Sequence, residues 1–255
     1  MKISVQSMIA AAMLSSIGLA TANGQENAAA DAEPGFALVE LFTSEGCSSC
    51  PSADANLVAI KEEAERSGQK ILTLSFHVDY WNYLGWQDPY SFAEATKRQR
   101  LYSSVHGTSQ VYTPQMIVNG TTEFVGSQRA KSKPAIQAAL RAKAKASLDL
   151  TSELSVNKIQ VKWKASGAQP TDLVNIALVQ NVAKEKVSAG ENSGRNLTHV
   201  NVVRQFRVIK VAETDQAVSL DFPSDFKSSD FHVVGYVQST DDAVIRAAAS
   251  AKIES

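Results

Sequence analysis

Several features are scarce or missing in this chain of 255 residues, and each absence excludes a class of protein. There are only two cysteines, Cys47 and Cys50, so a scaffold held by several disulfides is excluded. Lys and Arg number 25 against 26 Asp and Glu, and this lacks the basic excess that displaces counterions from nucleic-acid phosphates. No interior stretch approaches the roughly 20 apolar residues that span a bilayer. We therefore expect no nucleic-acid partner and no membrane span.

The N-terminus has the layout of a secretory signal. Lys2 is followed by mostly apolar or small residues up to Ala20, and Ala20-Thr21-Ala22 fits a small-x-small cleavage pattern. The alternative, a membrane anchor, is disfavoured because serines interrupt the short apolar stretch. We expect residues 1–22 to be a signal peptide and 23–33 a flexible leader. The mature protein would then be soluble and exported, periplasmic or secreted, where a cysteine pair is oxidised by default.

Residues 34–147 alternate between strand-like and helix-like patterns, which is typical of an α/β domain. The apolar run Phe36–Phe42 predicts a buried strand. The remaining patterns predict a helix after Pro51 that ends at Gly68, a strand at 71–78, a helix at 88–105 opened by Asp88-Pro89, strands at 115–118 and 122–125 that flank Asn119-Gly120, and a helix at 133–146. The predicted order is βαβαββα.

Residues 148–255 have a different hydrophobic pattern, because polar and apolar residues alternate as in half-exposed antiparallel strands. Short strands are predicted at 148–155, 158–164, 172–181, 198–204, 206–212, 216–221, 231–238 and 243–252. Many short strands separated by turns favour a β-sandwich. We therefore expect two domains in sequence, an α/β domain at 34–147 and an all-β sandwich domain at 148–255.

The only sulfur chemistry available lies at Cys47-Ser48-Ser49-Cys50-Pro51, between a buried strand and a helix start. Unpaired N–H groups and the helix dipole at that position stabilise a thiolate, which lowers its pKa. Cys47 would then attack a substrate, and Cys50, one turn further on, would resolve the mixed disulfide. Three alternatives stay open: a static structural disulfide, half of a zinc site, and a copper(I) site that adds Met116 or a histidine. Outside the metal alternatives, no cofactor is expected.

The first part of the chain resembles the thioredoxin superfamily. The resemblance rests on C-x-x-C-P after the first strand, on Thr-Pro-x-apolar-apolar-x-Asn-Gly before a hairpin, and on the βαβαββα order. It implies a thioredoxin-like domain in which a cis Thr113–Pro114 bond packs against the cysteines and the Thr113 backbone pairs with an extended substrate. It also implies that buried Glu40 relays protons to Cys50. The alternative for Glu40 is an ion pair with a neighbouring cation.

An aromatic segment lies between these motifs, with five aromatic residues in the fourteen positions 76–89. Trp81 and Trp86 would form a substrate wall, together with Tyr112 directly before Thr113. Alternatively, the two tryptophans fill the junction with the second half of the chain.

The mature chain as a whole resembles a family of bacterial secreted proteins that is classed under a domain of unknown function. The matching segments are V-E-L-F-T-S-E-G-C-S-S-C-P at 39–51 and the polar stretch 190–204. In that stretch Glu191, Arg195, His199 and Arg204 would converge, either to dock on the cysteine face or as a hairpin tip tied by an ion pair. The resemblance implies a fold and a location, but no substrate.

These observations together favour an exported thiol–disulfide oxidoreductase that acts on protein or small-molecule thiols and disulfides. Two other functions remain as alternatives. One is a non-catalytic copper(I) carrier that uses Cys47 and Cys50. The other is a structural interaction module in which the cysteines have no catalytic part.

Overall fold

The structure is a computed structural model that describes Met1 and residues 34–108, 110–212 and 216–254. The chain divides into two compact units, Met1–Asp31 and Ala32–Ser255. The predicted signal peptide and leader, apart from Met1, lie outside the described residues. Everything below concerns the second unit.

The first half of this unit contains four strands and three α-helices in the order that the sequence pattern indicates. They are β1 (Ala37–Thr43), α1 (Pro51–Ser67), β2 (Ile71–His77), α2 (Ala93–Val105), β3 (Gln115–Val118), β4 (Thr122–Val125) and α3 (Arg129–Arg141), with a 3₁₀ turn η1 (Asn82–Leu84) before α2. The predicted hairpin at Asn119-Gly120 is confirmed, and both residues have positive φ.

Two of these helices begin at residues other than those predicted. Helix α2 begins at Ala93, because the Asp88 carboxylate accepts the N–H groups of Glu45 and Tyr90 in a preceding turn and does not cap the helix. Helix α3 begins at Arg129, so Pro134 lies inside it and not in its first turn.

The second half consists of strands. They are β5 (Ser147–Ser155), β6 (Lys158–Ser166), β7 (Leu173–Lys186), β8 (Asn196–Lys210), β9 (Ala217–Asp221), β10 (Phe231–Gln238) and β11 (Ile245–Glu254), with a 3₁₀ turn η2 (Ser228–Asp230) before β10. Strands β7 and β8 form a long antiparallel hairpin. Its register shifts at Arg204, which is not opposite any residue of β7 in the strand pairing. The predicted break between the strands at 198–204 and 206–212 is this bulge within one strand.

All eleven strands belong to one mixed sheet, in the order β4-β3-β1-β2-β8-β7-β10-β11-β5-β6-β9. The expected thioredoxin-like domain followed by a separate sandwich is therefore wrong. The two halves are joined in the sheet where Ser75 of β2 pairs with Val202 of β8. Hydrophobic periodicity shows which residues are buried, but it does not show which strands are neighbours.

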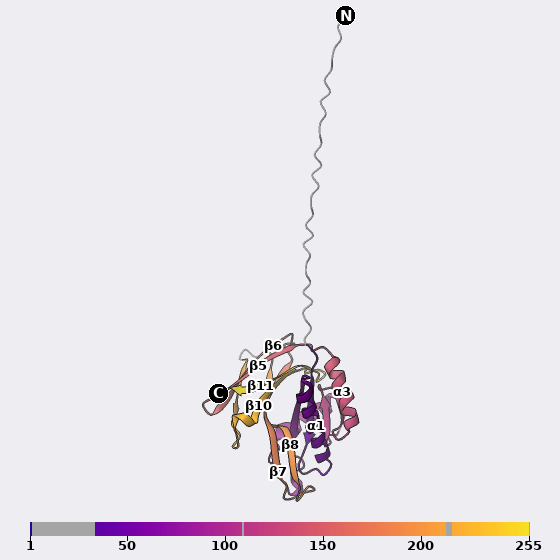
Figure 1. Cartoon of the computed structure of the whole chain (residues 1–255), viewed down its shortest axis with the longest axis vertical. Coiled ribbons are helices and arrows are strands. Elements are labelled where there is room, and N and C mark those ends of the chain that lie inside the picture. Colours follow the sequence, from indigo (N-terminus) through magenta and orange to yellow (C-terminus); the bar gives the residue numbers. More distant parts are fainter. Residues whose placement is uncertain (2–33, 109, 213–215, 255) are drawn as a thin grey trace. The chain divides into compact units, whose positions relative to one another are not determined.

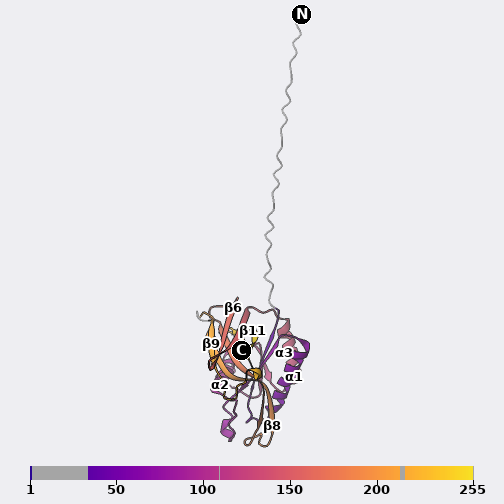
Figure 2. The ribbon, with the colours of Figure 1, turned by 60° about the vertical axis from the view of Figure 1, so that its left-hand side comes forward.

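Helices cover both faces of the first half of the sheet (Figures 1 and 2). Helices α1 and α3 pack on one face, over a cluster that includes Val39, Leu57 and Ile136. Helix α2 lies on the opposite face (Figure 2). Its cluster combines Phe42, Phe76 and Tyr102 from the first half with Ala177, Val179, Val203, Phe206, Val234 and Tyr236 from the second. The two halves thus share one hydrophobic core.

A third cluster is formed by strands of the second half alone and includes Ile159, Trp163, Ile176 and Val233. Within the ranges that the structure describes, no helix is long and apolar enough to cross a membrane.

Candidate functional site

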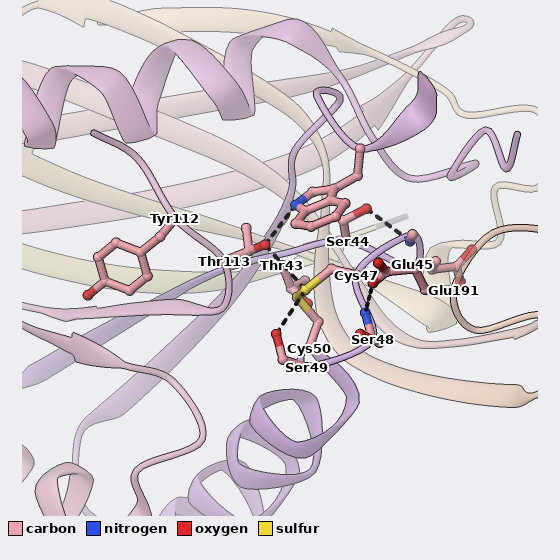
Figure 3. Close-up of a disulfide and its surroundings, with 12 residues drawn as sticks. Thr43, Ser44, Glu45, Cys47, Ser48, Ser49, Cys50, Tyr112, Thr113 and Glu191 are labelled. Carbon is pink, nitrogen blue, oxygen red and sulfur yellow. Dashed lines mark hydrogen bonds between the residues drawn. A yellow bond between two sulfur atoms is a disulfide. The ribbon is translucent and has the colours of Figure 1, made fainter. Parts of the chain in front are cut away.

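The cysteines lie where the sequence analysis places them, between the end of β1 and the start of α1 (Figure 3). Cys50 is the N-cap residue of α1, and Pro51 is its first helical residue. Cys47 and Cys50 form a disulfide with a Cα–Cα distance of 5.4 Å. Cys47 is 1% exposed and Cys50 0%, whereas Ser48 and Ser49 between them are exposed. The disulfide therefore lies directly beneath the surface at one short loop.

Two hydroxyl groups contact the sulfur of Cys47 (Figure 3). Thr113 donates its Oγ1 hydrogen to Cys47 Sγ at 3.3 Å, and Ser49 Oγ lies at the same distance. The indole Nε1 of Trp81 donates to Thr113 Oγ1 at 2.7 Å. Because the Thr113 oxygen accepts that N–H, its own hydrogen is directed toward the sulfur. Hydrogen bonds of this kind stabilise a thiolate more than a thiol.

The Thr113–Pro114 bond is cis, and the contact of Thr113 with Cys47 places this segment beside the disulfide. Tyr112 points away from the sulfurs (Figure 3). Burial raises the pKa of Tyr112 to about 12, and its carbonyl accepts a hydrogen bond from Gln99 at 2.7 Å. The roles of Thr113 and Tyr112 in substrate binding stay predictions.

The two tryptophans make polar contacts with the site. Trp81 reaches Thr113, and a Cβ on Gly46 would lie only 3.1 Å from the Trp81 Cβ. Glycine at position 46 therefore allows the aromatic segment to approach the residue before Cys47. Trp86 Nε1 donates to Glu45 Oε2 at 2.8 Å. Both are half-buried and both indole N–H groups are occupied, and their role as a substrate wall stays a prediction.

Behind the disulfide lies a buried group of carboxylates and imidazoles. His199 Nε2 is 3.1 Å from Glu45 Oε1, and its Nδ1 is 3.6 Å from Asp54 Oδ2. Burial opposes charge on this ring, but Asp54 and Glu45 outweigh it and raise the pKa of His199 to about 10. The cationic ring connects the loop before Cys47 with the first turns of α1.

His77 and Asp88 extend this group. His77 Nδ1 lies 2.7 Å from Asp88 Oδ2, and the His77 and His199 rings are 4.6 Å apart. Burial works against charge on Asp88, but His77 and the N–H groups of Glu45 and Tyr90 outweigh it, so the pKa of that carboxyl is lowered.

The tip of the β7–β8 hairpin lies against the cysteine loop. Glu191 accepts the Ser48 N–H at 2.9 Å. Asn192 donates to the carbonyls of Glu45 and Cys47 at 2.8 and 2.9 Å. Arg195 donates to Asn192 Oδ1, whereas Arg204 pairs with Asp225 and lies over the Tyr90 ring, 5.4 Å from its centroid. Of the four residues expected to converge, Glu191 and His199 contact the site directly and Arg195 does so through Asn192.

Glu40 is buried, but its contacts lead away from the cysteines. Arg98 of α2 donates to both of its carboxylate oxygens, from Nε at 2.5 Å and from a terminal nitrogen at 2.9 Å. The hydroxyls of Tyr102 and Tyr236 also donate to it. The structure gives Glu40 no hydrogen bond to Cys50, and its surroundings match the alternative of an ion pair with a cation.

Of the donors considered for copper(I), Met116 is engaged elsewhere and His199 is paired with the carboxylates of Glu45 and Asp54. The Met116 sulfur accepts a hydrogen bond from Ser132 of α3, and the two cysteine sulfurs are bonded to each other. Across the described parts of the chain, no group of three or more His, Cys, Asp or Glu side chains is arranged to hold a metal ion.

Three residues of the site were missed by the sequence analysis. Asp54 had a detectable signal, because it lies three positions before Leu57 on the apolar side of its helix, where a charge needs a partner. Asp88 was interpreted as a helix cap. Asn192 carried no signal beyond its place in a polar loop.

A groove of about 480 Å³ begins beside Cys50. It is lined by Pro51, Asp54, Ala55 and Val58 of α1 and by Arg195–Thr198 at the start of β8. This groove adjoins the loop that carries the disulfide.

The fold and site define a mixed-sheet protein with a C-x-x-C disulfide at the start of a helix. The tip of a β-hairpin that is distant in sequence contacts the loop carrying this disulfide. The chain belongs to the family described as "Protein of unknown function (DUF1223)", whose model matches residues 38–238. This confirms the expected membership of a domain-of-unknown-function family. Membership of the thioredoxin superfamily is not shown.

Solved structures similar to this chain include the following two. One is protein AGR_C_4864 from Agrobacterium tumefaciens, with 26% identity, a TM-score of 0.63, and coverage of 86% of this chain and 94% of that one. The other is HBP35 of Porphyromonas gingivalis, with 12% identity, a TM-score of 0.58, and coverage of 87% and 76%; at this identity the likeness concerns the fold alone. A comparison with curated proteins finds no match.

Proposed function

We propose that this protein is a thiol–disulfide oxidoreductase whose reacting sulfur is that of Cys47. One observation carries the proposal. Cys47 Sγ, at the entry to α1, is contacted by the hydroxyls of Thr113 and Ser49. A thiolate formed there gains two hydroxyl donors and the positive end of the helix dipole, which lower its pKa.

The reaction is a reversible exchange between two disulfides. The Cys47 thiolate attacks one sulfur of a substrate disulfide, and the other substrate sulfur leaves as a thiolate that takes up a proton. Cys50, after losing its proton, attacks Cys47 Sγ and displaces the first substrate sulfur. The substrate is reduced to a dithiol while Cys47 and Cys50 are oxidised to a disulfide, and the reverse sequence oxidises a substrate dithiol.

Access to the disulfide in this proposal is through the exposed Ser48–Ser49 loop. Both cysteines are buried, but the loop between them carries only the small side chains of Ser48 and Ser49, which are exposed. The groove beside Pro51 would receive the substrate chain next to the reacting sulfur. An exported location would favour the reverse sequence, in which the pair oxidises a substrate dithiol, because an oxidising compartment would return the reduced pair to the disulfide between turnovers.

The closest competing function is a structural disulfide. A bridge between residues three apart in sequence closes a very small loop and so removes little entropy from the unfolded chain. Such a bridge would therefore contribute little stability, which leaves exchange chemistry as the better explanation for the pair.

Partner trapping with two single variants tests the proposal. The Cys50→Ser variant keeps the attacking Cys47 and should accumulate mixed disulfides with substrate thiols, detected as reducible adducts by mass spectrometry. The matched Cys47→Ser variant should accumulate far fewer, because the two hydroxyl contacts that stabilise a thiolate are made to Cys47. Equal trapping by both variants would reverse the assigned roles. Absence of adducts in both, with no catalysis of disulfide reduction by the native chain, would refute the enzymatic function.

A further inference from the structure

The backbone N–H of Ser48, in the loop that carries the cysteines, is bound by a carboxylate from a distant part of the chain. Glu191 Oε2 accepts this N–H at 2.9 Å, across 143 residues of sequence. The Ser48 backbone holds the pKa of the Glu191 carboxyl below its usual range. A negative charge therefore lies next to the residue that follows Cys47.

The position of this carboxylate is fixed by its neighbour, although Glu191 itself is exposed. Asn192 is fully buried and bonds the carbonyls of Glu45 and Cys47 with its two amide hydrogens. Arg195 binds the remaining amide oxygen at 2.8 Å. The hairpin tip is thus anchored on both sides of Cys47, with Glu191 facing the loop (Figure 3).

We infer that Glu191 is a positioning residue that lowers the reduction potential of the Cys47–Cys50 pair and so favours its disulfide form. The inference rests on the proposed function and deepens it. Reduction produces a thiolate at Cys47, and the N–H groups around a helix start are what stabilise such an anion. Glu191 occupies the Ser48 N–H in the loop before this helix and places a negative charge next to the residue that follows Cys47. The reduced form therefore loses stabilisation while the disulfide does not.

Other charged groups face the same loop and also affect the stability of a Cys47 thiolate. Glu45 precedes Cys47, Asp54 belongs to α1, and His199 of β8 is paired with both carboxylates. Arg195 contributes a positive charge at the hairpin tip through Asn192. All four remain in place when only Glu191 is changed, so the difference between variants isolates its contribution.

Three substitutions separate charge from hydrogen bonding. Glu191→Gln keeps an oxygen that accepts the Ser48 N–H but removes the charge, and Glu191→Ala removes both. Glu185→Gln is the matched control, because it removes the same charge from the same hairpin at a residue that accepts the Lys186 N–H and not the Ser48 N–H. For each full-length protein, the ratio of oxidised to reduced form is measured in glutathione buffers, and the Cys47 pKa by thiolate absorbance.

For Glu191→Gln we expect the equilibrium constant for oxidation by glutathione to fall about threefold to fivefold. A fivefold fall corresponds to a rise in reduction potential of about 20 mV. The Cys47 pKa should fall with it by roughly half a unit. Because Glu191 is exposed, the difference should shrink at an ionic strength of about 1 M. Glu191→Ala should shift the equilibrium at least as far, and Glu185→Gln should leave it unchanged.

The inference is overturned if Glu191→Gln matches the native chain or shifts no more than Glu185→Gln. It is also overturned if only Glu191→Ala has an effect, because the hydrogen bond would then act without the charge. The measurement needs no substrate, so it is independent of the trapping experiment. Failed trapping together with a shifted potential would refute the oxidoreductase function and leave the effect of Glu191 standing.

Discussion

The hydroxyl of Thr113 offers the most direct test of the environment of Cys47. Thr113→Val keeps the shape of the side chain and removes the donor to Cys47 Sγ. A net hydrogen bond is worth about 0.5–1.5 kcal/mol, so we expect the Cys47 pKa in the reduced protein to rise by roughly half a unit to one unit. The measurement is the pH titration of thiolate absorbance.

Thr108→Val serves as the control for Thr113→Val. It removes a hydroxyl that bonds Ser103 on α2 and not the cysteine loop. An unchanged titration in Thr113→Val would mean that the hydroxyl plays no part in stabilising the thiolate.

His199 makes the stability of the whole chain depend on pH. Its pKa is about 10 in the folded protein and about 6.5 in an unfolded chain. The folded state therefore holds a proton that the unfolded state loses as the pH rises between these values. Its stabilising contribution is complete below about pH 6.5 and is lost as the pH rises toward 10.

We therefore expect His199→Gln to flatten the fall in unfolding free energy between about pH 6 and about pH 9. Urea titrations of both proteins at each pH measure the change. The control is His106→Gln, whose ring bonds the Gly120 carbonyl outside this network. A native chain whose stability does not fall over this range would contradict the assigned charge on His199.

The ion pair between β1 and α2 shows how an element is held in place. Arg98 of α2 binds Glu40 of β1, and its guanidinium lies within 6 Å of four ring centroids, those of Phe76, Tyr102, Phe206 and Tyr236. Arg98→Met would leave the Glu40 carboxylate buried without its cation. Breaking a buried pair in this way costs about 3–5 kcal/mol, so we expect a loss of that size in chemical denaturation.

A second substitution distinguishes loss of the pair from loss of packing. Glu40→Gln combined with Arg98→Met removes the uncompensated charge and should recover part of the loss. Lys61→Met, which breaks an exposed pair with Glu65 on α1, should cost less than about 1 kcal/mol. If the double variant is no more stable than Arg98→Met, the charge on Glu40 is not what destabilises the single variant.

Across the whole molecule, the sequence predicts local structure much better than the arrangement of the two halves. The C-x-x-C at a helix start, the Asn119-Gly120 hairpin and the buried β1 all follow from turn chemistry, capping and periodicity. The contact between β2 and β8 does not, because it joins residues more than 120 positions apart, such as Ser75 with Val202 and Thr73 with Asn201. No local pattern in either strand specifies that partner.

For the candidate site too, the sequence identifies individual residues but not how they are arranged around one another. Cys47, Cys50 and Thr113 are identifiable from their motifs, and Glu191 and His199 from an unusually polar loop. Their mutual positions come from the long β7–β8 hairpin, whose tip meets a loop more than 140 residues away. Glu40 shows the same limit. A buried acid in an apolar strand indicates that a partner exists, but the sequence alone does not show that the partner is Arg98.

The shared core beneath α2 predicts that the first half of the chain does not fold by itself. A fragment of residues 34–147 lacks Phe206, Val234 and Tyr236, which pack against Phe42 and Phe76 in the intact protein. Each large apolar side chain left exposed costs about 1.5–3 kcal/mol, against a total stability of about 5–15 kcal/mol for an ordinary domain. We expect the fragment to show no cooperative urea transition and weak near-ultraviolet circular dichroism. A chain of residues 23–255 should show a cooperative urea transition and strong near-ultraviolet circular dichroism. Adding residues 148–255 in trans should partly restore these two signals to the fragment. Cooperative unfolding of the 34–147 fragment alone would mean that the common sheet joins two independently stable halves.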